Sequence, residues 1–375
     1  PSYHLTDCDP HGDGLAAFEF ISRLANRGHQ LHVCVQGSNI RGALPETVTL
    51  HHIPKRTPAD ALKHIEYAVR VYSVFRRVSR NASIDIVHQL NPVRPGLSGL
   101  ISLHAVPLVL GLFVPSWPGS SKSGKTKSHS LLRRAATAMM KQADRFQQKQ
   151  AAALLLSTEA ARARIHSPQK YAACTYVIPY GIDLDRFRVD KDKTADSLTI
   201  LFLARLHEQK GIFTLLDALP RVFQKAPGAR VHIAGGGPAE HEVRERIAAL
   251  DIQDRVKLLG HVDRTAVPHL VQQCDVFCIP SHGEPFGLSA LEAMASGKPV
   301  VATDAGGLAH LVREEGGHKV PVGDPEVLAD ALIDLLTSRE KREQMGMYNR
   351  QLCEEVYDWE RVIDRLEDVY YSVLN

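Results

Sequence analysis

The segment PSHGEPFGLSALEAMASGKP, residues 280–299, follows an apolar run of strand length at residues 275–279 and carries two glutamates eight positions apart. Residues 285–288, Pro-Phe-Gly-Leu, are typical of a turn that opens a helix. A strand, a glycine loop and a helix N-terminus in series form an anion site, because the first helical N–H groups lack partners inside the helix. The segment therefore predicts a phosphate-binding edge of an α/β sheet, where the carboxylates of Glu284 and Glu292 accept hydrogen bonds from hydroxyl groups.

Phosphates flanked by hydroxyl groups are what a nucleotide sugar offers. The alternative is an ordinary strand–loop–helix unit with two solvated glutamates. The segment resembles the donor-binding signature of the family-4 retaining glycosyltransferases, which have the GT-B fold. The E-x7-E spacing, the Phe286-Gly287 pair and residues 291–303 (LEAMASGKPVVAT) match that signature. The resemblance covers nearly the whole chain and is strongest from about Val177 onward.

Size and composition agree with a globular protein of two domains. The chain has 375 residues, of which 44% are hydrophobic and 23% charged. We expect no membrane-spanning segment, because no apolar run approaches the ~18 residues needed to cross a bilayer. Six cysteines lie mostly in apolar strands, and the spacing of Cys274 and Cys278 has no matching pair, so we expect reduced thiols rather than a zinc site.

The net charge of +3 conceals an asymmetry between the two halves. Residues 1–178 contain 22 Lys and Arg against 10 Asp and Glu, a net charge of +12. Subtracting these from the totals of 45 and 42 leaves 23 and 32 for the remainder, a net charge of −9. Such a split indicates different partners for the two halves, with an anionic one for the first.

Strands alternate with helical patterns in each half, which predicts doubly wound parallel sheets. In the first half we expect strands at residues 3–8, 30–36, 84–89, 107–114, 153–158 and 176–179, with a loop at 9–14 and a helix at 15–27. In the second half we expect strands at 198–204, 230–234, 255–259, 275–279 and 299–302. The fold class is therefore two Rossmann-like domains facing across a cleft, the GT-B arrangement. Their boundaries are 1–180, joined by a C-terminal helix at 357–375, and 181–356.

A second cluster of candidate residues follows the strand at 198–204. Arg205 and Lys210, in ARLHEQKG, look like the arginine and lysine-glycine motif of the family, which implies a hold on the donor diphosphate. The alternative is a pair of solvated surface cations. Gly12 and Gly14 match the family's N-terminal glycine loop only in part, because Asp13 separates them.

The resemblance implies a full set of site residues. The catalytic residues would be Arg205, Lys210 and Glu284. The donor site would consist of Gly12, Gly14, Arg205, Lys210, Gly235, Gly237, His261, Val262, Glu284, Phe286, Gly287, Leu288 and Glu292. On the acceptor side the candidates are His11, Asp13 and His88. Glu292 is expected to bind the ribose diol and Glu284 the sugar hydroxyls. We expect no metal site, although Asp-x-Asp occurs three times.

The sequence thus predicts a retaining glycosyltransferase that moves a sugar from a nucleoside-diphosphate sugar, UDP before GDP, to a hydroxyl of a glycan, lipid-linked or small-molecule acceptor. We expect no cofactor beyond this co-substrate and no covalent nucleophile. One alternative is a sugar-nucleotide 2-epimerase of the same fold. Another is a catalytically silent sugar-nucleotide-binding protein.

Residues 115–150 suggest a contact with an anionic acceptor or membrane. Their only acid is Asp144, against eight cations, namely Lys122, Lys125, Lys127, Arg133, Arg134, Lys141, Arg145 and Lys149. The accompanying apolar stripe consists of Leu131, Leu132, Ala135, Met139 and Met140, as in an interfacial helix. A solvated loop and a helix that packs on its own domain is the alternative. We expect a cytoplasmic protein with a possible peripheral position at the inner face of the membrane, and no nucleic-acid partner.

Overall fold

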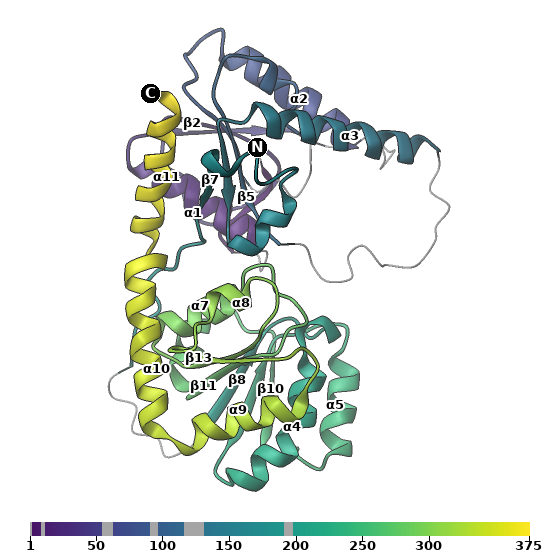
Figure 1. The fold of residues 1–375 in the computed structure, drawn as a ribbon, viewed down its shortest axis with the longest axis vertical. Coiled ribbons are helices and arrows are strands. Elements are labelled where there is room, and N and C mark those ends of the chain that lie inside the picture. The colour runs from purple at the N-terminus through teal and green to yellow at the C-terminus, as the bar shows by residue number, and fades with distance from the viewer. Residues whose placement is uncertain (1, 9–11, 55–62, 91–96, 116–130, 191–197) are drawn as a thin grey trace. The chain divides into compact units, whose positions relative to one another are not determined.

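The computed structural model describes residues 2–8, 12–54, 63–90, 97–115, 131–190 and 198–375 (Figure 1). The chain divides into two compact units. The first unit consists of Pro1–Val114, Ser121–Tyr180 and Val362–Asn375, and the second of Pro115–Ser120 and Gly181–Arg361. Each unit is described by itself below.

All strands of the first unit run parallel, in two sheets. The first sheet has the order β1-β2-β3, formed by β1 (Ser2–Thr6), β2 (Leu31–Asn39) and β3 (Val48–His52). The second has the order β4-β5-β6-β7, formed by β4 (Val87–Gln89), β5 (Leu108–Phe113), β6 (Ala153–Leu156) and β7 (Thr175–Val177). β5 and β6 are buried along their whole length, as strands covered on both faces should be.

Helices of the first unit bury one face each. The elements are α1 (Gly12–Asn26), α2 (Lys63–Val78), α3 (Leu131–Gln150), and short 3-10 turns at Ile101–Leu103 (η1), Glu159–Arg164 (η2) and Ala172–Cys174 (η3). On α2 the buried residues recur at helical spacing, at Tyr67, Val71, Phe75 and Val78. The partly buried Met140 of α3 packs against that cluster.

The second unit contains one parallel sheet of six strands in the order β10-β9-β8-β11-β12-β13. The strands are β8 (Thr199–Leu203), β9 (Arg230–Ala234), β10 (Val256–Gly260), β11 (Val276–Ile279), β12 (Val300–Thr303) and β13 (Gly317–Val320). This is the doubly wound order, in which the chain moves outward in one direction from β8 and in the other from β11. Both units are therefore parallel α/β structures, which confirms the predicted fold class.

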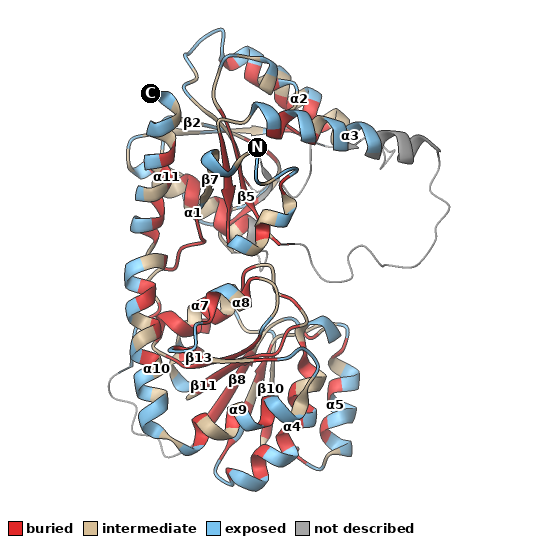
Figure 2. Cartoon of the chain, viewed as in Figure 1, coloured by how far each residue is buried: buried red, intermediate tan, exposed pale blue. Residues whose placement is uncertain are grey.

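Helices on both faces bury the six-stranded sheet of the second unit, and Figure 2 shows the buried strands between helices whose outer sides are exposed. They are α4 (Ile212–Lys225), α5 (Glu240–Ala249), α6 (Val267–Gln273), α7 (Leu288–Ala295), α8 (Leu308–Leu311), α9 (Pro325–Thr337) and α10 (Arg339–Leu352). A 3-10 turn at Glu208–Lys210 (η4) precedes α4, and a π-helical turn at Cys353–Tyr357 (η5) follows α10. The core consists mainly of aliphatic residues such as Ile200, Leu215 and Val231.

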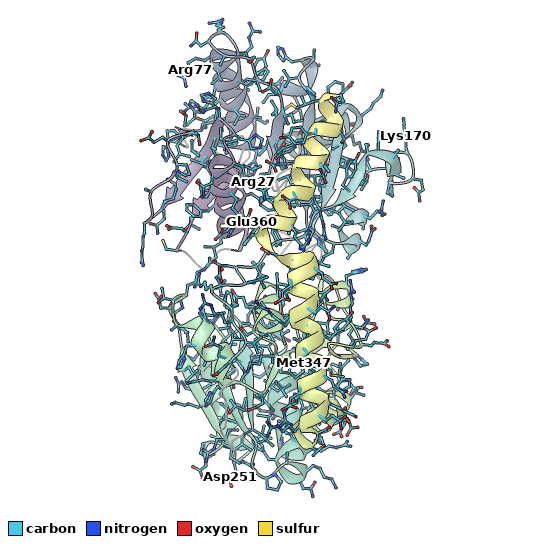
Figure 3. The ribbon with its side chains drawn as sticks, turned by 90° about the vertical axis from the view of Figure 1, so that its left-hand side faces the viewer. Arg27, Arg77, Lys170, Asp251, Met347 and Glu360 are labelled. Atoms are coloured by element: carbon cyan, nitrogen blue, oxygen red, sulfur yellow. The ribbon has the colours of Figure 1, made fainter. Side chains whose placement is uncertain are left out.

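The last helix, α11 (Trp359–Leu374), belongs to the first unit from Val362 onward. There Arg27 Nη1 donates to the carboxylates of Asp364 and Glu367, both at 2.6 Å, beside the C-terminal helix in Figure 3. A second oxygen of Glu367 lies 2.7 Å from His29 Nε2. These contacts hold the end of the chain to α1 and the turn that follows it.

Candidate functional site

The topology of the second unit places a crevice at the carboxyl ends of β8 and β11. These strands are neighbours, and the connections that follow them leave in opposite directions, which is the topological switch point at which open α/β sheets bind their ligands. The segment after β8 holds Arg205 and Lys210, and the segment after β11 holds Glu284. The candidate residues thus come together because of strand order, although they lie more than seventy positions apart in sequence.

Backbone contacts lock these two segments to one another. The carbonyl of Gln209 accepts hydrogen bonds from the backbone N–H of His282 and the hydroxyl of Ser281, both at 2.9 Å. Gly211 has a φ of 73°, and a Cβ there would lie 1.8 Å from the carbonyl oxygen of Pro280. Only glycine permits this approach.

Lys210 and Glu284 form an ion pair in the crevice, with Nζ donating to Oε2 over 2.6 Å. Their side chains are 17% and 14% exposed, so water screens the pair only in part. Arg205 differs from Lys210: it is exposed and forms no ion pair with any residue that the structure describes. The structure therefore brings Lys210 and Glu284 together and leaves the guanidinium of Arg205 open to solvent.

The helix predicted after the glycine loop is α7, which begins at Leu288. Its N-cap residue, Gly287, has a φ of 102° and packs so closely that a Cβ would lie 2.6 Å from Leu308 Cδ2. Phe286 is buried, and its ring packs edge-on against Tyr357 at 6.4 Å. The side chain of Phe286 thus serves the core, and only the backbone amides of 286–288 remain for an anion.

Glu292 lies within α7, and its side chain is only partly accessible. Burial raises the pKa of this carboxyl to about 7, while the nearby guanidinium groups of Arg264 and Arg186 act in the opposite direction. The guanidinium of Arg186 also donates to the carbonyl of Arg264. Our sequence analysis missed both arginines, since only tertiary folding brings these separated positions to Glu292.

The glycines after β9 support the loop that carries Arg205. A Cβ at Gly235 would lie 2.0 Å from the carbonyl oxygen of Ala204, and one at Gly237 would lie 2.2 Å from that of Leu206. The packing explains these glycines without a ligand. His261 and Val262 follow β10 at the same edge of the sheet, and His261 is exposed.

In the first unit the glycine loop has a different form from the one expected. α1 begins at Gly12, so Gly12 and Gly14 lie in the first helical turn rather than in a loop that ends at residue 14. The reason is that a helix tolerates glycine in its first turn, where backbone N–H groups have no helical partner. His11 and the side chain of Asp13 lie outside the described residues.

His88 is partly buried between β5 and the C-terminal helix. Its Nε2–H donates to the carbonyl of Gly111 at 2.9 Å, and its Nδ1 accepts from the hydroxyl of Tyr370 at 2.6 Å. Burial lowers the pKa of His88 to about 3 and raises that of Tyr370. Because both ring nitrogens are engaged, contact with an acceptor would require one of these bonds to break.

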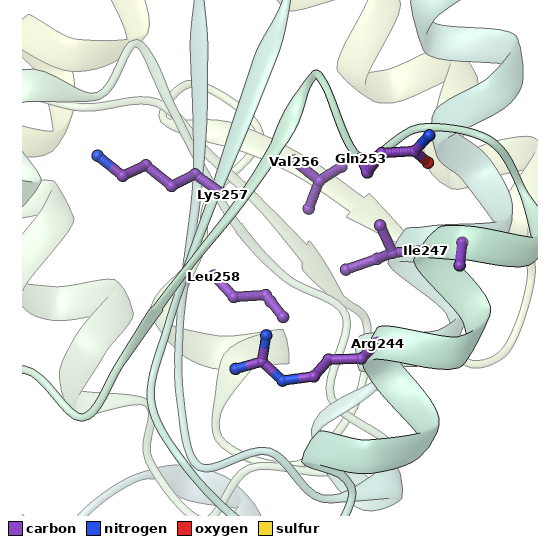
Figure 4. Close-up of a pocket in the computed structure, with 7 residues that line it drawn as sticks. Arg244, Ile247, Gln253, Val256, Lys257 and Leu258 are labelled. Carbon is purple, nitrogen blue, oxygen red and sulfur yellow. The ribbon is translucent and has the colours of Figure 1, made fainter.

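A separate hollow of about 450 Å³ lies beside the edge strand β10 (Figure 4). It is lined by Arg244, Ile247, Ala248, Gln253, Val256, Lys257 and Leu258. None of these is a predicted site residue, and β10 is separated from β8 by β9. The hollow is therefore distinct from the crevice at the carboxyl ends of β8 and β11, which has the convergent charged groups.

Two further observations concern membranes and metals. Among the described residues, no helix combines the length and apolar character needed to cross a bilayer. Over the same part of the chain, no three His, Cys, Asp or Glu residues are grouped so that they could hold a metal ion.

Two family models match consecutive parts of the chain. The model described as "Glycosyltransferase Family 4" matches residues 12–186, and the model described as "Glycosyl transferases group 1" matches residues 183–352. The phosphatidyl-myo-inositol mannosyltransferase of Mycobacterium leprae is 29% identical over 361 residues, which cover 92% of this chain and 89% of that protein. Other curated relatives are matched over only about half of their own length.

Solved structures share the fold over nearly the whole chain. A sucrose-phosphate synthase from Thermosynechococcus elongatus superposes with a TM-score of 0.75 at 20% identity and covers 99% of this chain and 98% of its own. HepE from Anabaena, solved in complex with UDP, also gives a TM-score of 0.75 at 20% identity, with 99% of each chain covered. At this identity the likeness speaks for the fold alone.

Proposed function

This chain belongs to the family-4 glycosyltransferases and has their GT-B fold, and on that premise we propose that it moves a sugar, with retention of configuration, from a nucleoside-diphosphate sugar to a hydroxyl group. The observation that carries the proposal is the convergence of Lys210, Glu284 and Arg205 on the crevice between β8 and β11. Cations suit a diphosphate, and a carboxylate suits sugar hydroxyls.

The proposed reaction uses fixed cations where a metal ion would otherwise act. The bond between the anomeric carbon and the phosphate oxygen breaks, and the acceptor oxygen forms a bond on the same face of the sugar. The acceptor proton passes to the departing phosphate. Arg205 and Lys210 would stabilise the charge that grows on the nucleoside diphosphate, which lowers the barrier because this charge is larger in the transition state than in the bound donor.

The two carboxylates have separate proposed roles in binding the donor. Glu284, which neighbours Lys210, would bind the sugar hydroxyls, and Glu292 would bind the ribose diol. Backbone amides of 286–288 would contact the distal phosphate at the start of α7. We favour UDP as the nucleotide and GDP as the second choice.

The acceptor is proposed to be a glycan, a lipid-linked molecule or a small molecule that the first unit binds. The exposed face of α3 supports a lipid surface as the place of reaction. Met139 and Phe146 are 51% and 38% exposed, and Lys141, Arg145 and Lys149 are exposed beside them. Such a face is suited to an anionic membrane, at which the protein would lie peripherally on the cytoplasmic side.

The one acidic residue of residues 115–150, Asp144, does not oppose contact with an anionic membrane. Asp144 is turned inward, where its carboxylate accepts hydrogen bonds from Gln147 at 2.9 Å and Gln148 at 3.1 Å. Lys122, Lys125, Lys127, and the side chains of Leu131, Leu132, Arg133, Arg134 and Ala135 lie outside the described residues. The name of the M. leprae relative, a mannosyltransferase acting on phosphatidyl-myo-inositol, agrees with an anionic lipid acceptor.

A thermal-unfolding screen against UDP-, GDP- and ADP-sugars tests the donor. A ligand at ~100 times its dissociation constant stabilises the folded protein by about 2.7 kcal/mol, which raises the melting temperature measurably. The stabilising donor is then incubated with enzyme, and release of nucleotide is followed with and without added acceptor. Stabilisation by none of these donors would contradict the proposal. Conversion of the donor to its 2-epimer without transfer would replace it with the isomerase.

A further inference from the structure

The ion pair of Lys210 and Glu284 should affect how tightly different ligands bind at this site. Both partners are largely shielded, and the bond of 2.6 Å has the length of a strong charge-assisted hydrogen bond. Lys210 therefore meets an arriving anion with its charge already balanced by a carboxylate. Arg205, exposed at the same strand end, does not.

The backbone on both sides of this pair is fixed. On one side, Gln209 receives two hydrogen bonds from residues 281 and 282, and Gly211 packs against the carbonyl of Pro280. On the other side, the carbonyl of Glu284 accepts from the N–H of Gly307 at 2.6 Å. Only the two side chains can therefore respond to a ligand, and the pair is the resting arrangement that the loops impose.

A diphosphate that approaches Lys210 is opposed by Glu284. It must either draw the ammonium away from the carboxylate or bind beside a negative charge, and both cost free energy. A donor with its sugar attached can offset this cost, because sugar hydroxyls donate hydrogen bonds to the carboxylate that the ammonium releases. A nucleoside diphosphate without the sugar has no such donors.

We infer that Glu284 is a specificity-determining residue that disfavours the spent nucleoside diphosphate relative to the intact donor, through its ion pair with Lys210. This inference rests on the proposed function. When the sugar has left, Glu284 returns to Lys210 and weakens the hold on the product. The same carboxylate thus favours both the loading of the donor and the release of the nucleotide.

The test compares Glu284→Gln with a matched control by calorimetric titration of UDP, GDP and their hexose conjugates. Glutamine keeps the shape of the side chain and removes its charge. We therefore expect the nucleoside diphosphate to bind about tenfold more tightly, a change in affinity that corresponds to one hydrogen bond to a charged group. The nucleotide sugar should gain no affinity. The ratio of the two dissociation constants should therefore narrow.

Glu208→Gln is the control, because Glu208 is exposed in the same turn as Lys210 and carries the same charge. It should leave the ratio unchanged. In a Lys210→Met background, Glu284→Gln removes an unpaired carboxylate rather than the partner of an ammonium, so its effect on nucleotide binding should differ in size from that in the wild type, and the double-mutant cycle measures the coupling of the two residues. Glu284→Ala provides a second variant without charge, and thermal unfolding verifies that every variant folds.

Unchanged or weaker nucleotide binding in both Glu284 variants would overturn the inference, as would an equal gain in Glu208→Gln. Either result leaves the proposed function standing if the wild type binds a nucleotide sugar. Failure of the wild type to bind every nucleotide and nucleotide sugar would instead remove the proposed function, and the inference with it.

Discussion

The two units of this protein follow one architecture but differ in the role that glycine has in the loops that the structure describes. In the second unit, glycines at 211, 235, 237, 306 and 307 each bring one loop against the backbone of another, and this packing positions the candidate donor site. In the first unit, Gly28 has a positive φ of 93° but no atom within 4 Å of the place where a Cβ would stand. The half with net charge −9 is thus built around a fixed crevice, and the half with net charge +12 offers an exposed basic surface.

The two halves also differ in how far their charged side chains are exposed and paired. In the second unit a few charges are shielded and paired, as Lys210 and Glu284 are. In the first unit Lys141, Arg145 and Lys149 lie on an exposed helix face, where each contributes weakly and salt screens it. Substitutions of the shielded pair in the second unit should therefore act singly and strongly, whereas those on the basic face should act as a sum.

The largest effect is expected for Lys210→Ala. Loss of one preorganised charge donor typically costs about 10²–10³ in turnover, so the rate of transfer should fall by roughly that factor. Lys257→Ala, which removes an exposed lysine from the edge strand β10, is the control and should leave the rate unchanged. The rate should also survive EDTA. Complete inactivation by the chelator with recovery in manganese would show that a metal, not Lys210, stabilises the leaving group.

The basic face of α3 should show the opposite, additive behaviour. Replacing Lys141, Arg145 and Lys149 together with Glu should reduce binding to anionic vesicles by about a hundredfold or more, because each cation near such a surface contributes on the order of 1 kcal/mol. Co-sedimentation with anionic and neutral vesicles at low and moderate salt measures this.

The control makes the same charge change in the second unit, at the exposed residues Lys225, Arg230 and Lys257. It should bind vesicles as the wild type does. Equal losses in both triple variants would mean that net charge alone attracts the protein. If the wild type fails to sediment with anionic vesicles at low salt, α3 does not recruit it.

Glycine substitutions compare loop packing in the two units directly. Gly211→Ala should destabilise the second unit by more than the about 1–2 kcal/mol that a left-handed backbone costs a side chain, since its Cβ also meets the carbonyl of Pro280. Gly28→Ala should show the backbone cost alone, and Gly228→Ala, which has open space and no positive φ, almost none. Melting temperatures rank the three, and a different order would contradict this account of loop packing.

Tyr370→Phe tests the partly buried contact of the first unit. It removes the hydrogen-bond donor of the partly buried Nδ1 of His88, so we expect a loss of about 1 kcal/mol in unfolding free energy. Tyr371→Phe, at the exposed neighbouring position, should cost little. Denaturant unfolding measures both. Since His88 and Tyr370 belong to the first unit, nucleotide affinity should be unchanged, and a parallel loss of affinity would speak against that separation.

The smallest effect concerns the pH dependence of Glu292. Its pKa in the folded protein, about 7, lies above its ordinary value of 4.5, so folding favours the protonated form. This contribution is complete below pH 4.5 and is lost as the pH rises through about 7. Glu292→Gln cannot ionise, so its melting temperature relative to the wild type should increase from pH 5 to pH 8. A constant difference would show that burial does not control this carboxyl.

Local sequence pattern was sufficient for much of the second unit and for less of the first. The strands at residues 230–234 and 275–279 are recognisable because short segments rich in apolar residues end in glycine or proline. The pairing of Lys210 with Glu284 is consistent with the roles that the family resemblance implied. We did not predict β3, because Val48–His52 is short and contains only two apolar residues. α2 was also missed, although its buried positions follow a helical period.

What escaped prediction depends on residues that meet only in the folded chain. The sequence alone does not show that Arg264 and Arg186 lie near Glu292, or that Tyr370 contacts His88. In both cases the residues are far apart in sequence and meet only when the chain folds. The shifted pKa values of Glu292 and His88 could not be predicted from the sequence either. They are set by burial, which a motif does not encode.

The anchoring of the C-terminal helix also bears on the synthesis of the protein. Arg27, His29 and His88 are translated before the second unit, whereas their partners Asp364, Glu367 and Tyr370 are translated after it. Domains generally fold as units, in the order of synthesis. The first unit therefore lacks these contacts until residues 362–375 have been made, whereas the second unit ends at Arg361 and needs none of them. A chain truncated after residue 361 should accordingly have a protease-resistant second unit and a first unit that is more open to cleavage.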